Sequence, residues 1–210
     1  GKTKVLTTKV AHLVSDKNID PHNILAITFT NKAAKEMKDR VLKMLGAKAY
    51  QIQISTFHSL GLLFLRENYA KLGFEKNFTI LDSDDTLTVI KKILKDMNLD
   101  PKIYNPRAIR NKISGAKNEL MDAENYSRFA NTDYEQTVTD IFRRYEKKIK
   151  KNNSVDFDDL LVLPIKLFKE NPEILKQYQN RFQYILVDEY QDTNEAQYVL
   201  IKMLSAKNQN

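Results

Sequence analysis

The 210-residue sequence contains no cysteine and has only five glycines and five prolines. The absence of cysteine excludes disulfide bonds, thiolate zinc sites and iron–sulfur clusters, and it favours a reducing compartment. No apolar run approaches the roughly 18 residues that a membrane-spanning helix needs, and no signal peptide is recognisable. Internal repeats, low-complexity tracts and Gly/Ser linkers are also absent. We therefore expect a cytoplasmic protein that has no membrane partner.

The composition suits one globular unit or two small ones, because 42% of the residues are hydrophobic and 29% are charged. The net charge of +7 is unevenly spread. Residues 1–76 carry 13 basic and 6 acidic side chains, whereas residues 156–210 carry 6 basic and 9 acidic ones. A basic N-terminal third fits a polyanionic partner such as a nucleic acid or a nucleotide. Solvated surface lysines are the alternative interpretation.

The first 76 residues alternate between helical and strand patterns. Apolar residues recur at helical spacing in three segments, and two shorter segments between them have the pattern of strands. The helical segments are 4–14, 32–45 and 57–73, and the strand segments are 23–30 and 51–56. Strands that are separated by helices predict a parallel sheet with helices on its faces.

The pattern becomes helical from about residue 77 to 155, with Asp82 or Ser83 and Thr132 or Asp133 as candidate caps. No convincing core strand is recognisable there, apart from the short run "FTI" at 78–80. A helix that begins at 156 follows, and we expect it to be kinked or stopped near Pro164. A helix at 172–180, a strand at 183–188 and a helix at 194–205 complete the chain. The order predicts an α/β fold whose parallel-sheet domain is interrupted by an all-helical insertion. We assign 1–76 and 156–210 to the sheet domain and 77–155 to the insertion.

The chain begins with Gly1, Lys2 and Thr3, which match the last three residues of the phosphate-binding loop G-x-x-x-x-G-K-[ST]. In that loop the lysine reaches the phosphates and the hydroxyl ligates Mg²⁺. Three residues alone are a weak signal, because they recur by chance in any lysine-rich sequence.

A second motif, which contains two acidic residues, strengthens the interpretation of Gly1, Lys2 and Thr3 as part of a phosphate-binding loop. Residues 185–192, "ILVDEYQD", form an apolar run that ends in Asp188 and Glu189. Two neighbouring carboxylates repel each other, so a cation at the end of the strand is the usual reason for such a pair. In a Walker-B strand the first acid orients Mg²⁺ and the second polarises the attacking water. An exposed acidic turn is the alternative, but the two motifs together favour a site for Mg²⁺ and ATP at the carboxyl ends of the strands.

Polar and aromatic residues follow two of the predicted strands. Phe29, Thr30, Asn31 and Lys32 come after the first strand, and Thr56, Phe57 and His58 come after the second. An aromatic face can stack on a nucleobase, while hydroxyls, a lysine and a helix N-terminus hold phosphates. Each phenylalanine has the alternative role of a core residue that closes the sheet.

Two further segments have simpler explanations. The basic stretch 143–151 is a solvated helix face or a contact to duplex phosphates. The acidic "DFDD" at 156–159 is a helix cap with favourable dipole interactions.

These motifs, "GKT", "ILAITFTNKAAKEM", "STFHSLG", "DFDDLL" and "ILVDEYQDTNEAQ" in this order, closely resemble the UvrD/PcrA/Rep group of superfamily 1 DNA helicases. The resemblance covers all 210 residues. It implies a RecA-like P-loop NTPase domain, called 1A, that is split by a helical insertion, called 1B. It also implies ATP-driven 3′→5′ movement along single-stranded DNA and duplex unwinding in repair and replication.

The resemblance assigns roles residue by residue. Gly1, Lys2, Thr3 and Lys4 match the nucleotide-binding motif, with Thr3 and Asp188 as Mg²⁺ ligands. Lys4 stands where the family usually has arginine, so it keeps the charge and lacks the planar guanidinium.

Catalytic and DNA-binding roles follow in the same way. Glu189 matches the residue that activates water, and Gln191 matches the glutamine near the γ-phosphate, beside the catalytic lysine Lys2. The two polar–aromatic segments match the motifs that contact single-stranded DNA: Phe29, Thr30, Asn31 and Lys32, and Thr56, Phe57 and His58.

The resemblance further implies a longer protein. The start of the phosphate loop and a second RecA-like domain, called 2A, are expected outside these residues, so we expect the 210 residues alone to hydrolyse ATP negligibly. The expected partners are domain 2A, single-stranded DNA and junctions of single- and double-stranded DNA, in a nucleoid-associated cytoplasmic protein. Two alternatives stay open: a non-enzymatic single-strand-binding module with relic Walker residues, and a helicase subunit of the AddA/RecB helicase–nuclease type.

Overall fold

The computed structural model describes all 210 residues, which form two compact units. The first unit comprises 1–63, 165–193 and 197–210, and the second comprises 64–164 and 194–196. The boundaries therefore fall within three helices, α3 (Phe57–Asn68), α8 (Asp159–Glu170) and α10 (Glu195–Ser205), and at 193/194. The division into 1A and 1B at residues 76 and 155 stays a prediction.

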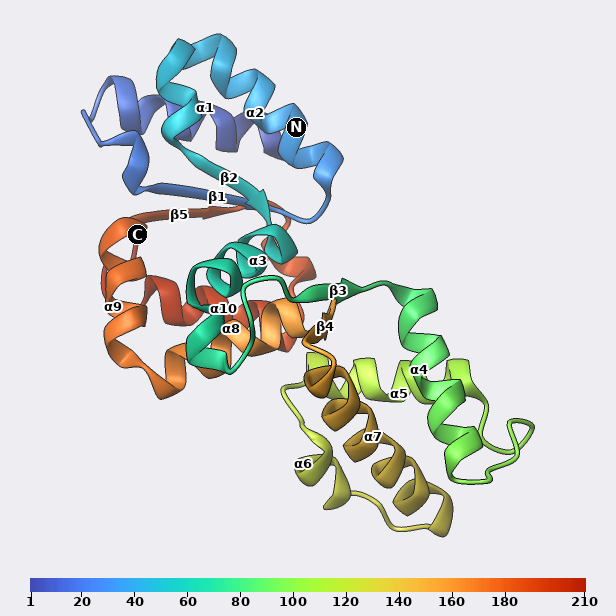
Figure 1. The fold of residues 1–210 in the computed structure, drawn as a ribbon. Helices are drawn as coiled ribbons and strands as arrows, with labels where there is room; N and C mark the ends of the chain where they lie inside the picture. Colours follow the sequence, from blue (N-terminus) through green and yellow to red (C-terminus); the bar gives the residue numbers. More distant parts are fainter. The chain divides into compact units, whose positions relative to one another are not determined.

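The first unit is built on a parallel three-stranded sheet in the order β2–β1–β5, as the alternation of strands and helices predicted. Figure 1 shows α1 and α2 on one face of this sheet and α9 and α10 on the other. The strands are β1 (Ile24–Thr28), β2 (Gln53–Thr56) and β5 (Tyr184–Val187). The helices are α1 (Lys2–Ser15), α2 (Asn31–Leu45), α9 (Pro172–Arg181) and α10 (Glu195–Ser205), with short 3-10 turns at Pro21–Asn23, Gly46–Gln51 and Tyr190–Asp192.

Buried apolar residues explain why β1 lies in the middle of the sheet. All five residues of β1 are buried, which is typical of a strand covered on both faces. On the α1/α2 face, Ile24 and Ala26 pack with Val10 of α1 and with Met37 and Val41 of α2. The apolar residues of both helices recur at three- and four-residue intervals, so one face of each helix is available for the sheet.

Local signals set the ends of α2. Thr30 caps its N-terminus, because the Thr30 hydroxyl accepts a hydrogen bond from the Ala33 amide at 3.1 Å. Gly46 ends the helix at a φ of 61°, a conformation that glycine adopts without steric cost.

The second unit is mainly helical between two short strands, β3 (Thr79–Leu81) and β4 (Ser154–Asp156), which pair in parallel. The run at 78–80 that the sequence analysis singled out overlaps β3, whereas β4 was not predicted, because three residues are too few to reveal a period. The helices between the strands are α4 (Ser83–Asp96), α5 (Pro106–Asn118), α6 (Ala123–Ser127) and α7 (Asp133–Lys151), and a 3-10 turn at Tyr69–Leu72 precedes them.

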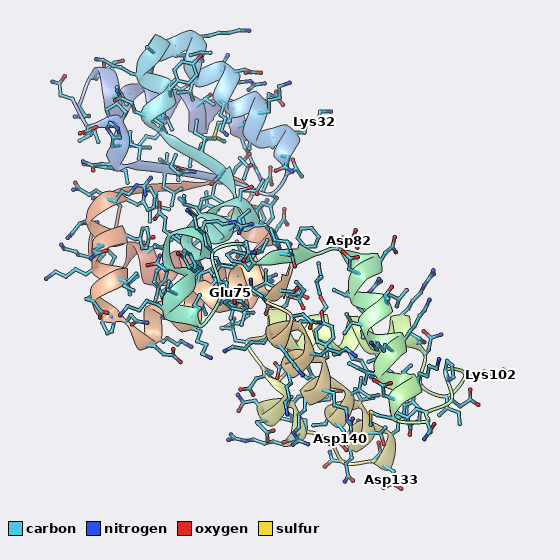
Figure 2. The ribbon with its side chains drawn as sticks, viewed as in Figure 1. Lys32, Glu75, Asp82, Lys102, Asp133 and Asp140 are labelled. Carbon is cyan, nitrogen blue, oxygen red and sulfur yellow. The ribbon has the colours of Figure 1, made fainter.

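Two of these helices begin at the predicted caps. Asp82 and Thr132 each form a reciprocal capping box with the third residue of the helix, at α4 and α7 respectively. Figure 2 labels Asp82 where β3 gives way to α4.

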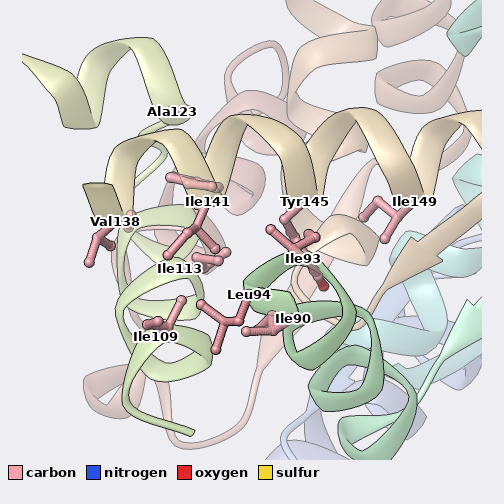
Figure 3. Close-up of a cluster of buried hydrophobic side chains, with 12 residues drawn as sticks. Ile90, Ile93, Leu94, Ile109, Ile113, Ala123, Val138, Ile141, Tyr145 and Ile149 are labelled. Atoms are coloured by element: carbon pink, nitrogen blue, oxygen red, sulfur yellow. The ribbon is translucent and has the colours of Figure 1, made fainter. Parts of the chain in front are cut away.

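An apolar cluster holds α4, α5 and α7 together (Figure 3). Ile90, Ile109 and Ile141 contribute one fully buried side chain from each helix. Each of these side chains leaves water when the three helices pack, and such burial is worth about 1.5–3 kcal/mol for a side chain of this size.

A charged group lies beside this cluster in the same unit. Lys117 of α5 is only 4% exposed, and its Nζ donates to Asp156 Oδ2 at 2.7 Å and to Asp159 Oδ1 at 3.0 Å. The Tyr145 hydroxyl also donates to Asp156, at 2.8 Å. Asp156 and Asp159 in turn accept hydrogen bonds from each other's backbone amides, which caps α8. "DFDD" is therefore a cap, as predicted, but a buried one that an internal lysine neutralises.

Burial and charge pull the pKa values of this group in opposite directions. Burial raises the pKa of Asp159 to about 6, although Lys117 opposes the shift. Burial also favours the neutral form of Asp156, but Lys117 outweighs it and holds the Asp156 pKa below its usual range. Burial lowers the pKa of Lys117, whereas the two carboxylates raise it above its ordinary value and dominate. Lys117 therefore stays charged across the physiological range.

We predict that Lys117→Met lowers the free energy of unfolding of the second unit by about 3–5 kcal/mol, because it leaves two carboxylates buried without their cation. Urea unfolding followed by far-UV circular dichroism measures the change. Lys112→Met is the matched control, since Lys112 lies on the same helix and is exposed; we expect it to change stability by less than about 0.5 kcal/mol. Equal midpoints for the two variants would contradict the prediction.

Candidate functional site

Parallel pairing brings the predicted site segments of the first unit to one edge of the sheet. Ile27 of β1 lies in register with Val187 of β5 and with Ser55 of β2. Phe29, Phe57 and Asp188 all follow within two residues of these positions. The Asp188 amide donates to the Ile27 carbonyl at 2.9 Å, which fixes the start of the acidic turn against β1.

Thr3 and Asp188 meet at this edge. Thr3 lies in the first turn of α1, and its Oγ1 donates to Asp188 Oδ2 at 3.1 Å, although the residues are 185 positions apart. Asp188 is buried and Thr3 is half-buried. The structure therefore joins the two residues that were predicted from separate motifs to share one ion.

The chemistry of this pair fits Mg²⁺. Both groups are oxygen donors, and Mg²⁺ is usually held by one or two carboxylates together with water and phosphate oxygens. No group of three or more His, Cys, Asp or Glu residues is arranged to hold a metal anywhere in the chain. Thr3 and Asp188 supply two of the oxygen ligands that Mg²⁺ needs.

The start of α1 suits an anion. Gly1 is the N-cap, and no side chain of the first turn is acidic. The unpaired amides and the helix dipole favour negative charge at such an end. Lys2 and Lys4 are both exposed there, so their ammonium groups are available to a phosphate.

The acidic turn after β5 has an unusual backbone. Glu189 has a φ of 54°, which is the left-handed region that non-glycine residues seldom adopt. Its side chain is half-buried, and Gln191 Nε2 donates to Glu189 Oε2 at 2.5 Å. Gln191 itself is exposed. The turn therefore keeps the two predicted catalytic side chains, Glu189 and Gln191, next to each other.

Phe29 and Phe57 form an aromatic pair at the same edge. Their ring centroids are 5.3 Å apart with an angle of 59° between the planes. Phe29 is half-buried, whereas Phe57 is only 1% exposed. Phe57 thus packs in the core and supports Phe29, and its predicted contact with DNA stays a prediction.

The polar residues around the pair differ in exposure. Thr30, Asn31 and Lys32 are exposed at the N-terminus of α2, and Figure 2 labels Lys32 there. Thr56 is buried and caps α3, since its Oγ1 accepts from the Ser59 amide at 3.1 Å. His58 is half-buried, and burial lowers its pKa, so the ring is neutral at physiological pH.

Sequence reasoning missed one polar connection. Asn194, the residue after the acidic turn, belongs to the second unit and donates from Nδ2 to Asn118 Oδ1 at 3.3 Å. Asn118 directly follows Lys117 on α5. No pattern in the sequence pairs these residues, because 76 positions separate the two asparagines.

Comparison with known sequences identifies the family. The UvrD/REP helicase N-terminal domain matches residues 1–210. The chain is 55% identical over its whole length to the ATP-dependent DNA helicase PcrA of Bacillus subtilis (strain 168), of which it covers 28%. Proteins of the same name from Staphylococcus epidermidis and Staphylococcus aureus (strain Mu50) are 49% and 48% identical over all 210 residues, which cover 29% of each.

No helix of the structure combines the length and the apolar character needed to cross a membrane.

The chain spans less than a third of the length of these curated relatives. Its matching region nonetheless includes every motif discussed above, from Gly1 to the acidic turn. The chain therefore belongs to the UvrD/REP helicase family, with the N-terminal domain of that family along its entire length.

Proposed function

We propose that this chain is the part of an ATP-dependent DNA helicase that binds Mg²⁺–ATP and single-stranded DNA. The contact between Thr3 and Asp188 carries the proposal, because it joins a helix N-terminus suited to phosphate with a carboxylate suited to Mg²⁺. The relatives' name, ATP-dependent DNA helicase PcrA, supports the same activity.

Each residue at the nucleotide end has a distinct task in this proposal. Lys2 and the amides of the first turn of α1 hold the phosphates, with Gly1 and Lys4 beside them. Thr3 and Asp188 hold Mg²⁺, which supplies charge neutralisation at the phosphate oxygens. Glu189 accepts a proton from the attacking water, and Gln191 keeps the Glu189 carboxylate oriented through their hydrogen bond.

Single-stranded-DNA-stimulated ATP hydrolysis tests the proposal directly. It is measured on the 210-residue chain and on a longer protein that carries it together with a second RecA-like domain. We expect turnover only from the longer protein, since an arginine supplied from a second domain typically contributes about 10³–10⁵ in rate. Absence of turnover from both would favour the non-enzymatic binding module.

Glu189→Gln in the longer protein is predicted to lower kcat for ATP by about 10²–10⁴-fold, the usual contribution of a general base. ATP affinity should change little, because the amide keeps the shape of the side chain. Steady-state kinetics and nucleotide binding measure the two effects. Glu195→Gln is the control: Glu195 is exposed on α10 and should tolerate the change. An unchanged kcat for Glu189→Gln would remove Glu189 from the mechanism.

DNA binding is proposed for the aromatic edge of the sheet. Phe29 is partly exposed, and its ring packs against the buried ring of Phe57. The exposed part of the Phe29 ring can therefore stack on a base. Thr30, Asn31 and Lys32 surround the capped start of α2, where phosphate oxygens are favoured. Thr56 and His58 flank Phe57 and complete the edge.

Phe29→Ala is predicted to weaken binding of a single-stranded oligonucleotide by about 1–3 kcal/mol, the usual value of one base–aromatic stack. Fluorescence anisotropy with a labelled oligothymidylate, at fixed salt, measures the change. The matched control is Tyr50→Ala, because Tyr50 is 79% exposed in the same unit and lies outside the proposed edge. Unchanged affinity for Phe29→Ala would return Phe29 to a purely structural role.

The remaining assignments are part of the same proposal. Residues 77–155 would form domain 1B. Domain 2A of a longer parent protein, single-stranded DNA and DNA junctions would be the partners. With these partners, the protein would act in DNA repair and replication, in the cytoplasm and in association with the nucleoid. The named relatives favour the helicase over a subunit of the AddA/RecB type.

A further inference from the structure

Two neighbouring strands of the first unit end in the same pair of residues, after which the chain follows different paths. Thr28 and Thr56 lie in register at the ends of β1 and β2, and a phenylalanine follows each of them. Thr56 caps α3 directly, so Phe57 lies in the first turn of that helix and is buried. After Thr28, the next helix begins only at Asn31, so Phe29 lies in a short connection and stays half-buried.

The Thr28 hydroxyl closes this connection. Its Oγ1 donates to the Thr30 carbonyl at 3.2 Å, and the same carbonyl accepts from the Ala34 amide at 3.0 Å. The Thr30 hydroxyl accepts from the Ala33 amide at 3.1 Å. A continuous set of hydrogen bonds therefore joins the last residue of β1 to the first turn of α2 and spans Phe29.

Thr28 is held firmly enough to act as an anchor. It is only 1% exposed, and its strand is paired with β2 on one side and with β5 on the other. Phe29 is the first residue beyond the strand. The contact with Phe57 limits the ring of Phe29, whereas the bond from Thr28 limits the backbone that carries this ring.

Packing alone does not explain a hydroxyl at this position. The other four residues of β1 are apolar and buried, and a valine has the shape of a threonine and suits a strand equally well. The hydroxyl therefore adds one property that valine lacks, which is a hydrogen bond to the residue that caps α2.

We propose that Thr28 is a positioning residue for single-stranded DNA: its hydroxyl fixes the connection from β1 to α2 and so holds Phe29 where its ring meets a base. Thr28 does not touch DNA in this role, because it is buried. The inference rests on the proposed function of Phe29 as a base-stacking residue. All the residues that carry it lie in the first unit.

Fluorescence anisotropy of a labelled oligothymidylate with the longer protein, at fixed salt and without nucleotide, tests this role. Thr28→Val removes the hydroxyl and keeps the shape of the side chain, and the Thr30 carbonyl keeps its bond from Ala34. We expect the Kd to rise about two- to fivefold, the effect of one modest hydrogen bond. Thr28→Ser, which keeps the hydroxyl, should bind like the native protein. Native affinity for Thr28→Val, or an equal loss in Thr28→Ser, would overturn the proposal.

A double variant separates positioning from a general loss of stability. In the Phe29→Ala background, Thr28→Val should weaken binding no further, because the side chain that Thr28 positions is already gone. A further loss as large as the one seen with Phe29 present would show that Thr28 acts independently of Phe29, and would contradict the inference.

Thr7→Val is the matched control. Thr7 is buried in the same unit, and its hydroxyl likewise donates to a backbone carbonyl, that of Lys4, at 2.9 Å. This variant should keep native affinity for DNA. An equal loss in Thr7→Val would show that removing any buried hydroxyl of the unit weakens binding, and the specific role of Thr28 would fall.

Hydrogen–deuterium exchange distinguishes failure of this inference from failure of the proposed function. Thr28→Val is expected to speed exchange of the Ala33 and Ala34 amides about two- to fivefold, since both are bonded to the residue that Thr28 holds. Native exchange in Thr28→Val would refute the anchoring. If Phe29→Ala leaves DNA affinity unchanged while Thr28→Val still speeds exchange, the DNA-binding role of Phe29 is wrong and the anchoring by Thr28 stands.

Discussion

The parallel pairing of β1 with β5 and β2 is the constraint on which the candidate site depends. Side chains alternate between the two faces of a strand, so a slip of one residue would move every side chain of β5 to the opposite face. The observed register places Val187 beside Ile27 and binds the Asp188 amide to the Ile27 carbonyl. In this register the Asp188 carboxylate lies 3.1 Å from the Thr3 hydroxyl.

The buried apolar residues of β1 impose that register. Ile24 and Ala26 face α1 and α2, so the strand that pairs with them must present its own apolar residues to the same layer. Tyr184 and Leu186 do so, because both pack against that cluster. Hydrophobic packing thus fixes the position of a charged group at the end of the strand, although no charged residue takes part in the packing.

Most of the fold could be predicted from local patterns of apolar and capping residues in the sequence. Periodicity identified the three strands of the parallel sheet and its flanking helices, because each has enough residues to show a period. The capping residues Asp82 and Thr132 were recognisable from their side chains. Of the short strands, only β3 overlaps a run that the sequence singled out, 78–80, and β4 was not predicted, since a three-residue strand is defined by its distant partner.

Pro164 shows a second limit of local patterns. Proline was expected to kink or stop the helix near 164, because it lacks an amide donor and costs about 3 kcal/mol inside a helix. The helix does not stop there, because α8 continues through Pro164 to Glu170. Leu161, Ile165 and Phe168 are buried on this helix, so tertiary packing outweighs the local penalty.

Some functional and structural residues could likewise be predicted from local sequence, and others could not. Thr3, Asp188, Glu189 and Phe29 were found because short motifs place them directly after predicted strands or at a helix start. The polar contacts of Lys117 and Asn118 in the second unit were not found, because their partners lie 39 to 76 positions away and a single lysine on a helix resembles a solvated one. Contacts of this length become visible only in three dimensions.

The two neighbouring residues of α5 have different physical tasks. Lys117 makes strong, buried ionic bonds, so replacing it endangers the second unit as a whole. Asn118 is neutral and makes longer hydrogen bonds at 3.3 and 3.4 Å, each of which is worth little to folding. The ionic cluster therefore supplies most of the polar stabilisation at this point of the second unit, and the asparagine beside it supplies little.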